Sequence, residues 1–143
     1  MIITIGRECG CQGDEFAALL AEQYHFPYYN KKAILQMARE EGILEKHPDF
    51  FGEIPVDTLL YTIASTENED SLLMVPGNAL SMLKKKKDFV LVGRCGNVVF
   101  GKEPDVMRIF LTGNKEERIK TIAQKHNISE RKAKRLVEET DAR

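Results

Sequence analysis

A glycine-punctuated stretch near the N-terminus, GRECGCQGDEF at residues 6–16, has the residue types of a phosphate-binding loop. Backbone amides in such a turn can point inward together, and the following helix adds the positive end of its dipole, so an anion is held without a side-chain charge. The usual pattern is not matched, because Gln12 stands at a glycine position and Gly13 at the lysine position. By itself the string is therefore a weak signal, and a tight strand-to-helix turn without a ligand is an alternative interpretation.

The segments that follow alternate between strand and helix patterns, which predicts an α/β fold with a parallel sheet and helices on both sides. Strands are expected from short apolar runs near residues 2–5, 26–29, 89–92 and 107–112. Helices are expected at 15–24, 31–41, 57–65, 71–83, 115–125 and 131–139, the last two capped by Asn114 and Ser129.

Ligands of such folds bind at the carboxyl ends of the strands. That rule predicts that residues 6–13, 29–32 and 93–97 share one crevice.

Length and composition indicate one domain and exclude some partners. The chain has 143 residues, 43% of them hydrophobic, and 21 basic and 22 acidic residues give a formal charge of −1. Nothing in this balance favours a nucleic acid or a membrane as partner, and no apolar run is long enough to span a bilayer. Three cysteines and no signal-peptide pattern favour reduced thiols and a cytoplasmic location.

Three stretches resemble the cytidylate kinase-like family, a branch of the P-loop nucleoside monophosphate kinases whose loop lacks the usual lysine. They are GRECGCQGDEFAALLAEQYHFPYYNKKAI, FVLVGRCGNVVFGKEPDVMRIFLTGNKEERIKTI and NISERKAKRLVEETDAR. The resemblance implies a three-layer α/β/α P-loop NTPase fold with a parallel sheet of about four to five strands. It also implies a single kinase-like domain over 1–143, in which 31–85 form an acceptor-binding helical insertion and 114–143 the helices beside the lid.

The activity implied by the resemblance is transfer of a phosphoryl group from ATP to a nucleoside monophosphate, with CMP favoured. This reaction needs two nucleotides held in line and cations around the transferred group. Mg²⁺ is expected, but its ligands are not clear from the sequence. The residues expected at the donor phosphates are Gly6, Arg7, Gly10, Cys11, Gln12, Gly13 and Asp14. For Arg7, an exposed ion pair with Glu8 is an equally good interpretation.

Further positions match the acceptor and lid segments of the family. The residues expected at the acceptor are Tyr29, Asn30, Lys31 and Arg94, and those expected around the transferring phosphate are Arg94, Arg118, Arg135 and Arg143. Guanidinium groups suit both roles, because they bind phosphate in a two-point fashion. A structural salt bridge is the alternative for Arg94, and a surface ladder with glutamates is the alternative for Arg118.

Several departures from the family favour a second interpretation, a catalytically impaired module that binds or senses nucleotides. Val92 and Cys95 stand where bacterial cytidylate kinases carry aspartates, and Asp14 and Glu15 place negative charge beside the phosphate loop. The sequence stops at Arg143, where relatives continue through the lid and a last strand. We therefore expect either that the chain is a C-terminally truncated fragment or that a partner subunit, such as a second copy in a homo-oligomer, completes the sheet. We expect little kinase activity from the 143-residue form alone.

Overall fold

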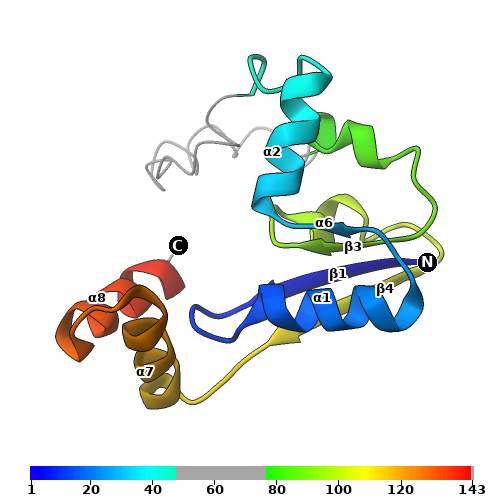
Figure 1. Cartoon of the computed structure of the whole chain (residues 1–143). Helices are drawn as coiled ribbons and strands as arrows, with labels where there is room; N and C mark the ends of the chain where they lie inside the picture. Colours follow the sequence, from blue (N-terminus) through cyan, green and yellow to red (C-terminus); the bar gives the residue numbers. More distant parts are fainter. Residues whose placement is uncertain (48–76, 143) are drawn as a thin grey trace, which may run out of the picture.

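The fold is an α/β structure around a parallel sheet of four strands, seen in a computed structural model that describes residues 1–47 and 77–142 (Figure 1). The strand order is β2-β3-β1-β4, with β1 at Ile2–Arg7, β2 at Tyr28–Tyr29, β3 at Phe89–Val92 and β4 at Val106–Leu111. The helices are α1 (Gly13–Tyr24), α2 (Lys31–Glu40), α6 (Gly96–Val99), α7 (Lys115–His126), α8 (Glu130–Asp141) and the short 3₁₀ helix η1 (Ser81–Leu83).

The two central strands are buried on both faces, as expected for a parallel sheet covered on both sides. On β3, Val90 and Val92 face α1, whereas Phe89 and Leu91 face the opposite layer. The same alternation on β1 sends Ile3 toward α1. Side chains two residues apart share a face, so a continuous apolar run supplies two cores at once.

One helix packs on one face of the sheet and several shorter segments pack on the other (Figure 1). Ala17 and Ala21 bury the inner side of α1, and their small side chains let the helix approach the strands closely. The opposite face is covered by α2, η1 and Phe100 at the end of α6. The predicted layered α/β fold is therefore confirmed.

The last two helices form a third, smaller core beyond the carboxyl end of β4 (Figure 1). Ile122 of α7 packs on Ala133 and Val137 of α8, with Cys9 of the first loop at its border. The two predicted caps are confirmed, since Asn114 accepts hydrogen bonds from the amides of Glu116 and Glu117, and Ser129 from that of Lys132.

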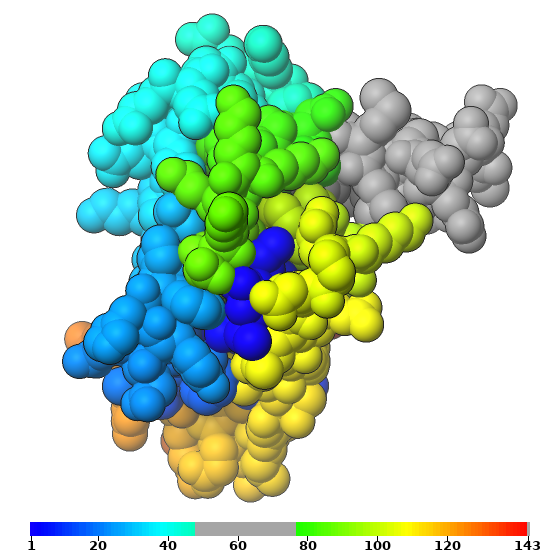
Figure 2. Space-filling model, turned by 90° about the vertical axis from the view of Figure 1, so that its right-hand side faces the viewer, coloured from blue at the N-terminus to red at the C-terminus, as the bar shows by residue number. Residues whose placement is uncertain are grey.

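The amino terminus of β1 lies at the other end of the sheet. In Figure 2 the dark blue start of the chain is seen between the segment after residue 77 and the segment that leads into β4. Its ammonium group forms ion pairs with Asp88 and Asp105, which precede β3 and β4. These contacts hold the starts of three adjacent strands together, so the carboxyl ends of the same strands also lie side by side.

Some predicted elements differ from the structure. The helix expected at 57–65 lies outside the described residues, and of the one expected at 71–83 the structure describes a short helical stretch at 77–79 followed by η1. The sequence reasoning missed α6 entirely. None of the helices in the described ranges is long and apolar enough to cross a membrane.

Candidate functional site

The loop between β1 and α1 wraps closely around the start of α7. Gly10 has a φ of +88°, and a Cβ atom there would lie 2.7 Å from the backbone oxygen of Arg118. Gln12 also adopts the left-handed region, with a φ of 54°, immediately before α1. Residues 10–13 therefore turn the chain sharply into the helix, in a shape that only glycine allows at position 10.

Backbone amides at the start of α1 are the part of the loop suited to an anion. Earlier amides already have partners, because Glu8 donates to the oxygen of Leu111, Cys9 to the Asp141 carboxylate and Cys11 to the oxygen of Glu8. The first turn of a helix has amides without intrahelical acceptors, and no side chain at Gln12 caps this one. A phosphate group could accept these hydrogen bonds and would also gain from the helix dipole.

Asp14 in this first turn is tied to the neighbouring β2 strand. The hydroxyl of Tyr28 donates to its Oδ1 at 2.7 Å. Burial, followed by this hydrogen bond, raises the pKa of Tyr28 above its ordinary value, so the hydroxyl stays a donor at neutral pH. The contact joins the start of α1 to the strand that leads to Tyr29, Asn30 and Lys31. We call residues 8–12, between β1 and α1, the phosphate loop, after the role that the sequence predicts for them.

Arg118 is a buried structural contact rather than a member of a surface ladder. Only 7% of the residue is exposed. Its Nη1 atom lies 2.7 Å from Oδ2 of Asp141 and 3.1 Å from the oxygen of Cys9, and its Nε donates to the oxygen of Gly113. We call Arg118 with these partners and Glu8 the Arg118 cluster. A catalytic role for Arg118 stays a prediction, and in this arrangement its guanidinium joins α7, α8 and the phosphate loop.

Glu8 belongs to this cluster and not to an ion pair with Arg7. Its Oε2 accepts a hydrogen bond from the Gly113 amide at 3.1 Å and lies 3.5 Å from Nε of Arg118. Arg7, at the end of β1, is exposed and has no hydrogen-bond or ion-pair partner among the described residues. The interpretation of Arg7 as the partner of Glu8 is therefore wrong.

The stability that the Arg118 cluster contributes should depend on pH through the carboxyl group of Asp141. Burial alone would raise the pKa of this carboxyl, but the hydrogen bonds from Arg118 and the Cys9 amide outweigh it and hold the pKa below its ordinary value. A carboxyl with a lowered pKa adds stability above its unfolded pKa, near 3.9, which is lost as the pH falls through the folded value.

We therefore expect the free energy of unfolding to fall below about pH 4 more steeply in the wild type than in Asp141→Asn. Urea titrations of both proteins between neutral and acidic pH measure this difference. Parallel curves for the two proteins would contradict the assignment to Asp141.

Two of the residues predicted at the acceptor have clear structural contacts. The ring of Tyr29 packs edge-on against Phe89, with 5.9 Å between ring centroids. The side chain of Asn30 caps α2 by accepting a hydrogen bond from the Ala33 amide at 3.0 Å. Lys31 is the first residue of α2 and is exposed. Acceptor binding by these three residues stays a prediction.

Asn30→Ala is expected to lower the free energy of unfolding by about 1 kcal/mol, because the first turn of α2 loses its side-chain cap. Asn30→Asp is the matched control, since a carboxylate caps the same amide. Chemical denaturation of the two variants and the wild type measures the loss. Equal destabilisation by both substitutions would show that the cap is not the cause.

The turn after β3 places Arg94 at the carboxyl edge of the sheet, next to the phosphate loop. Gly93, Arg94 and Cys95 have φ values of 68°, 56° and 57°, three left-handed residues in a row. The turn leads directly into α6. The Arg7 side chain reaches Gly93 from the end of β1, so residues 6–13 and 93–97 adjoin as expected from the sequence.

Arg135 and Arg143 are also predicted around the transferring phosphate. No contact among the described residues places them at the carboxyl edge of the sheet. Arg135 lies on the exposed surface of α8, where its Nε atom is 2.7 Å from Oε1 of Glu139. Arg143 lies outside the described residues. Their roles in phosphoryl transfer stay predictions.

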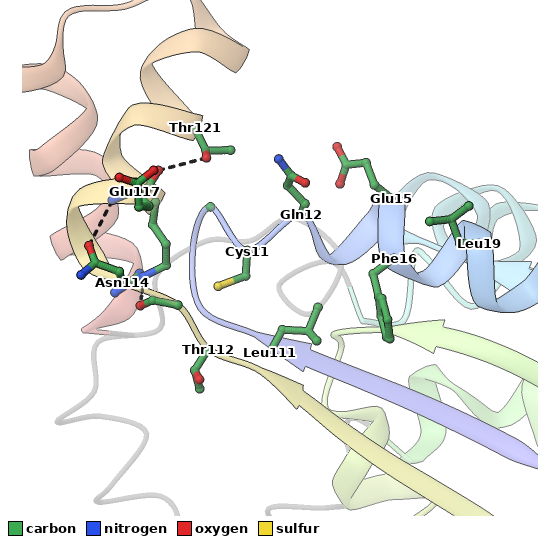
Figure 3. A pocket seen from close by; sticks show the side chains of 13 residues that line it. Cys11, Gln12, Glu15, Phe16, Leu19, Leu111, Thr112, Asn114, Glu117 and Thr121 are labelled. Atoms are coloured by element: carbon green, nitrogen blue, oxygen red, sulfur yellow. Dashed lines mark hydrogen bonds between the residues drawn. The ribbon is translucent and has the colours of Figure 1, made fainter.

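A pocket of about 460 Å³ opens between α1, the end of β4 and α7 (Figure 3). Phe16 and Leu19 of α1 form its apolar side, and Asn114, Glu117 and Thr121 face them from α7 and its N-cap. The floor includes Gly10, Cys11 and Gln12 of the phosphate loop. Burial raises the pKa of the Cys11 thiol, so this group is neutral at pH 7 and does not repel an anion.

Sequence reasoning missed three residues that shape the site: Glu8, Tyr28 and Asp141. Their partners lie 14 to 132 positions away in the sequence. Tyr28 contacts Asp14, Glu8 contacts Gly113, and Asp141 contacts Cys9. Only Tyr28 had a signal in the sequence, because it directly precedes Tyr29, Asn30 and Lys31, which are predicted at the acceptor.

Comparison with known proteins gives one family. A sequence profile of the cytidylate kinase-like family matches residues 2–143. No curated protein matches the chain. A solved structure of an uncharacterized protein from Eubacterium ventriosum ATCC 27560 is 23% identical, with a TM-score of 0.69, over 99% of this chain and 71% of the other. TT1252 from Thermus thermophilus is 17% identical with a TM-score of 0.48, over 93% of this chain and 76% of that chain.

Proposed function

Because the chain belongs to the cytidylate kinase-like family, we propose that it binds a nucleoside triphosphate and transfers its terminal phosphoryl group to a nucleoside monophosphate, CMP being favoured. The observation that carries this proposal is the family match over residues 2–143. Within these residues, a glycine-rich loop leads from β1 into a first turn of α1 that has no side-chain cap. Such a turn suits the phosphates of ATP. The proposed location is the cytoplasm, which fits the reduced cysteines.

The pocket beside the loop supports a donor nucleotide in one orientation. With the phosphates at the start of α1, the nucleoside would extend over Phe16 and Leu19 toward Asn114. An aromatic and an aliphatic side chain can pack against a base, and polar groups on α7 can bind its edge or the ribose. The acceptor would then approach from the side of β2 and β3, near Asn30 and Arg94.

Mg²⁺ is the cofactor that such a donor brings. A magnesium ion is usually held by one or two carboxylates together with substrate phosphates, so a complete protein cage is not needed. The described residues contain no group of three or more potential ligands, but Asp14 stands beside the proposed phosphate position. It would hold the ion, which when bound neutralises charge on the donor phosphates and turns the nearby carboxylate from a repulsive group into a ligand.

The second candidate is a nucleotide-binding module with impaired catalysis. It is favoured by Gly13 in place of a lysine, and by Val92 and Cys95 in place of carboxylates. Calorimetric titration with ATP and with CMP, followed by a coupled assay of ADP release, separates the two. Binding with CMP-dependent ADP release supports the kinase, binding without turnover supports the module, and absence of ATP binding contradicts both.

A further inference from the structure

The side chain of Arg7 occupies the space into which a side chain at position 13 would extend. A Cβ atom built on Gly13 would lie 2.9 Å from Cδ and 3.0 Å from Cγ of Arg7. Contacts this short do not occur between well-packed carbon atoms. Gly13 is itself buried at the start of α1. The stem of Arg7 therefore covers it.

Backbone conformation does not explain the glycine at position 13. Gly10 and Gly93 both need positive φ, whereas Gly13 begins an ordinary helix and is not among the residues with positive φ. Glycine is also a poor helix former. The requirement at position 13 is thus for space, and the group that takes the space is a cationic side chain.

The other end of Arg7 reaches the turn after β3. Its Nη1 atom lies 2.8 Å from the position of a Cβ on Gly93, and Cζ lies 3.8 Å from it. The guanidinium thus extends from the start of α1 to the turn after β3, across the carboxyl ends of the adjacent strands β1 and β3. No described residue pairs with it. Its charge is therefore available to a ligand at that edge of the sheet.

We propose that Arg7 supplies the cation that phosphate loops normally obtain from a lysine at the position of Gly13. The inference rests on the donor site proposed above. The lysine of a phosphate loop reaches the terminal phosphates of the nucleotide from the start of the helix. Here the cation enters the same volume from the end of β1, and a fork of N–H donors replaces a single ammonium. Gly13 and Gly93 leave room for this side chain.

Measurements of nucleotide affinity test whether the charge of Arg7 contacts the terminal phosphates. We expect Arg7→Ala to weaken ATP binding by about tenfold or more in calorimetry, and AMP binding much less, because a charge-assisted contact to the terminal phosphates is lost. Arg108→Ala is the matched control, since it removes an exposed arginine from the neighbouring strand β4, and should change ATP affinity less than about twofold. The double variant Arg7→Ala with Gly13→Lys returns a cation to the same volume and should regain much of the lost affinity.

Chemical denaturation tests, without any ligand, whether Arg7 and a side chain at position 13 compete for the same space. Gly13→Ala should destabilise the wild type more than it destabilises Arg7→Ala, because only the wild type has the arginine stem against position 13. An equal cost in both backgrounds, or ATP binding that Arg7→Ala leaves unchanged, would overturn the inference. If the wild type binds no ATP, it is the proposed function that fails, and the denaturation cycle still reports whether Arg7 and position 13 compete for space.

Discussion

Arg118→Met is expected to lower the free energy of unfolding by about 2 to 3 kcal/mol, because a buried guanidinium with one charged and two backbone acceptors is lost. Methionine keeps part of the apolar stem but none of the donors. Asp141 then remains in a partly buried position without its 2.7 Å partner, and the backbone oxygens of Cys9 and Gly113 lose their hydrogen bonds. Urea unfolding followed by circular dichroism measures the loss.

Arg135→Met is the matched control on the same pair of helices. Its guanidinium is exposed and, among the described residues, pairs with Glu139 four residues later, so we expect the free energy of unfolding to stay close to that of the wild type. Similar losses in the two variants would mean that the Arg118 cluster contributes no more than a surface pair.

Gly10→Ala is expected to be the most damaging small substitution in the phosphate loop. The left-handed conformation costs a residue with a Cβ about 1 to 2 kcal/mol, and the added carbon meets a backbone oxygen that cannot rotate away, 2.7 Å distant. We expect a total loss of about 3 kcal/mol or more in the free energy of unfolding, together with weaker ATP binding, because the loop must move off α7.

Gly42→Ala separates the two contributions. Gly42 has a φ of +68°, but a Cβ atom there would meet nothing within 4 Å. The substitution should therefore cost only the conformational part, about 1 to 2 kcal/mol, and leave ATP affinity unchanged. If both glycine variants lose the same stability in denaturation experiments, the contact with Arg118 is not significant.

The parts of this fold that local sequence determines were predicted well. The run at 89–92 coincides with β3, and Asn114 and Ser129 cap the helices assigned to them, since a buried strand and a helix cap each depend on a few adjacent residues. The strand expected at 26–29 is shorter in the structure. The amide of Phe26 donates to the oxygen of Ala21 at the end of α1, so this residue ends a helix before β2 begins.

The parts that long-range contacts determine were predicted poorly. Nothing in the sequence around Arg118 indicates burial, because its partners come from the first loop and from the end of α8. The four-residue helix α6 follows three left-handed residues, two of which are not glycine and carry no such signal. The proximity of Arg7 to Gly13 likewise depends on side-chain packing that the spacing of the residues does not reveal.

The small core shared by α7 and α8 has a consequence for how the molecule opens. Its buried members are Ile122, Ala133 and Val137. The two helices contact the rest of the chain at Cys9, through the Arg118 cluster and through the exposed Lys125–Glu15 ion pair. Amide protons in these two helices should exchange with deuterated solvent through a partial unfolding that leaves the sheet intact, sooner than those of β1 and β3. Each such partial unfolding breaks the hydrogen bond from the amide of Cys9 to the carboxylate of Asp141. The amide of Cys9, in the phosphate loop, should therefore exchange at the same rate as the amides of α7 and α8.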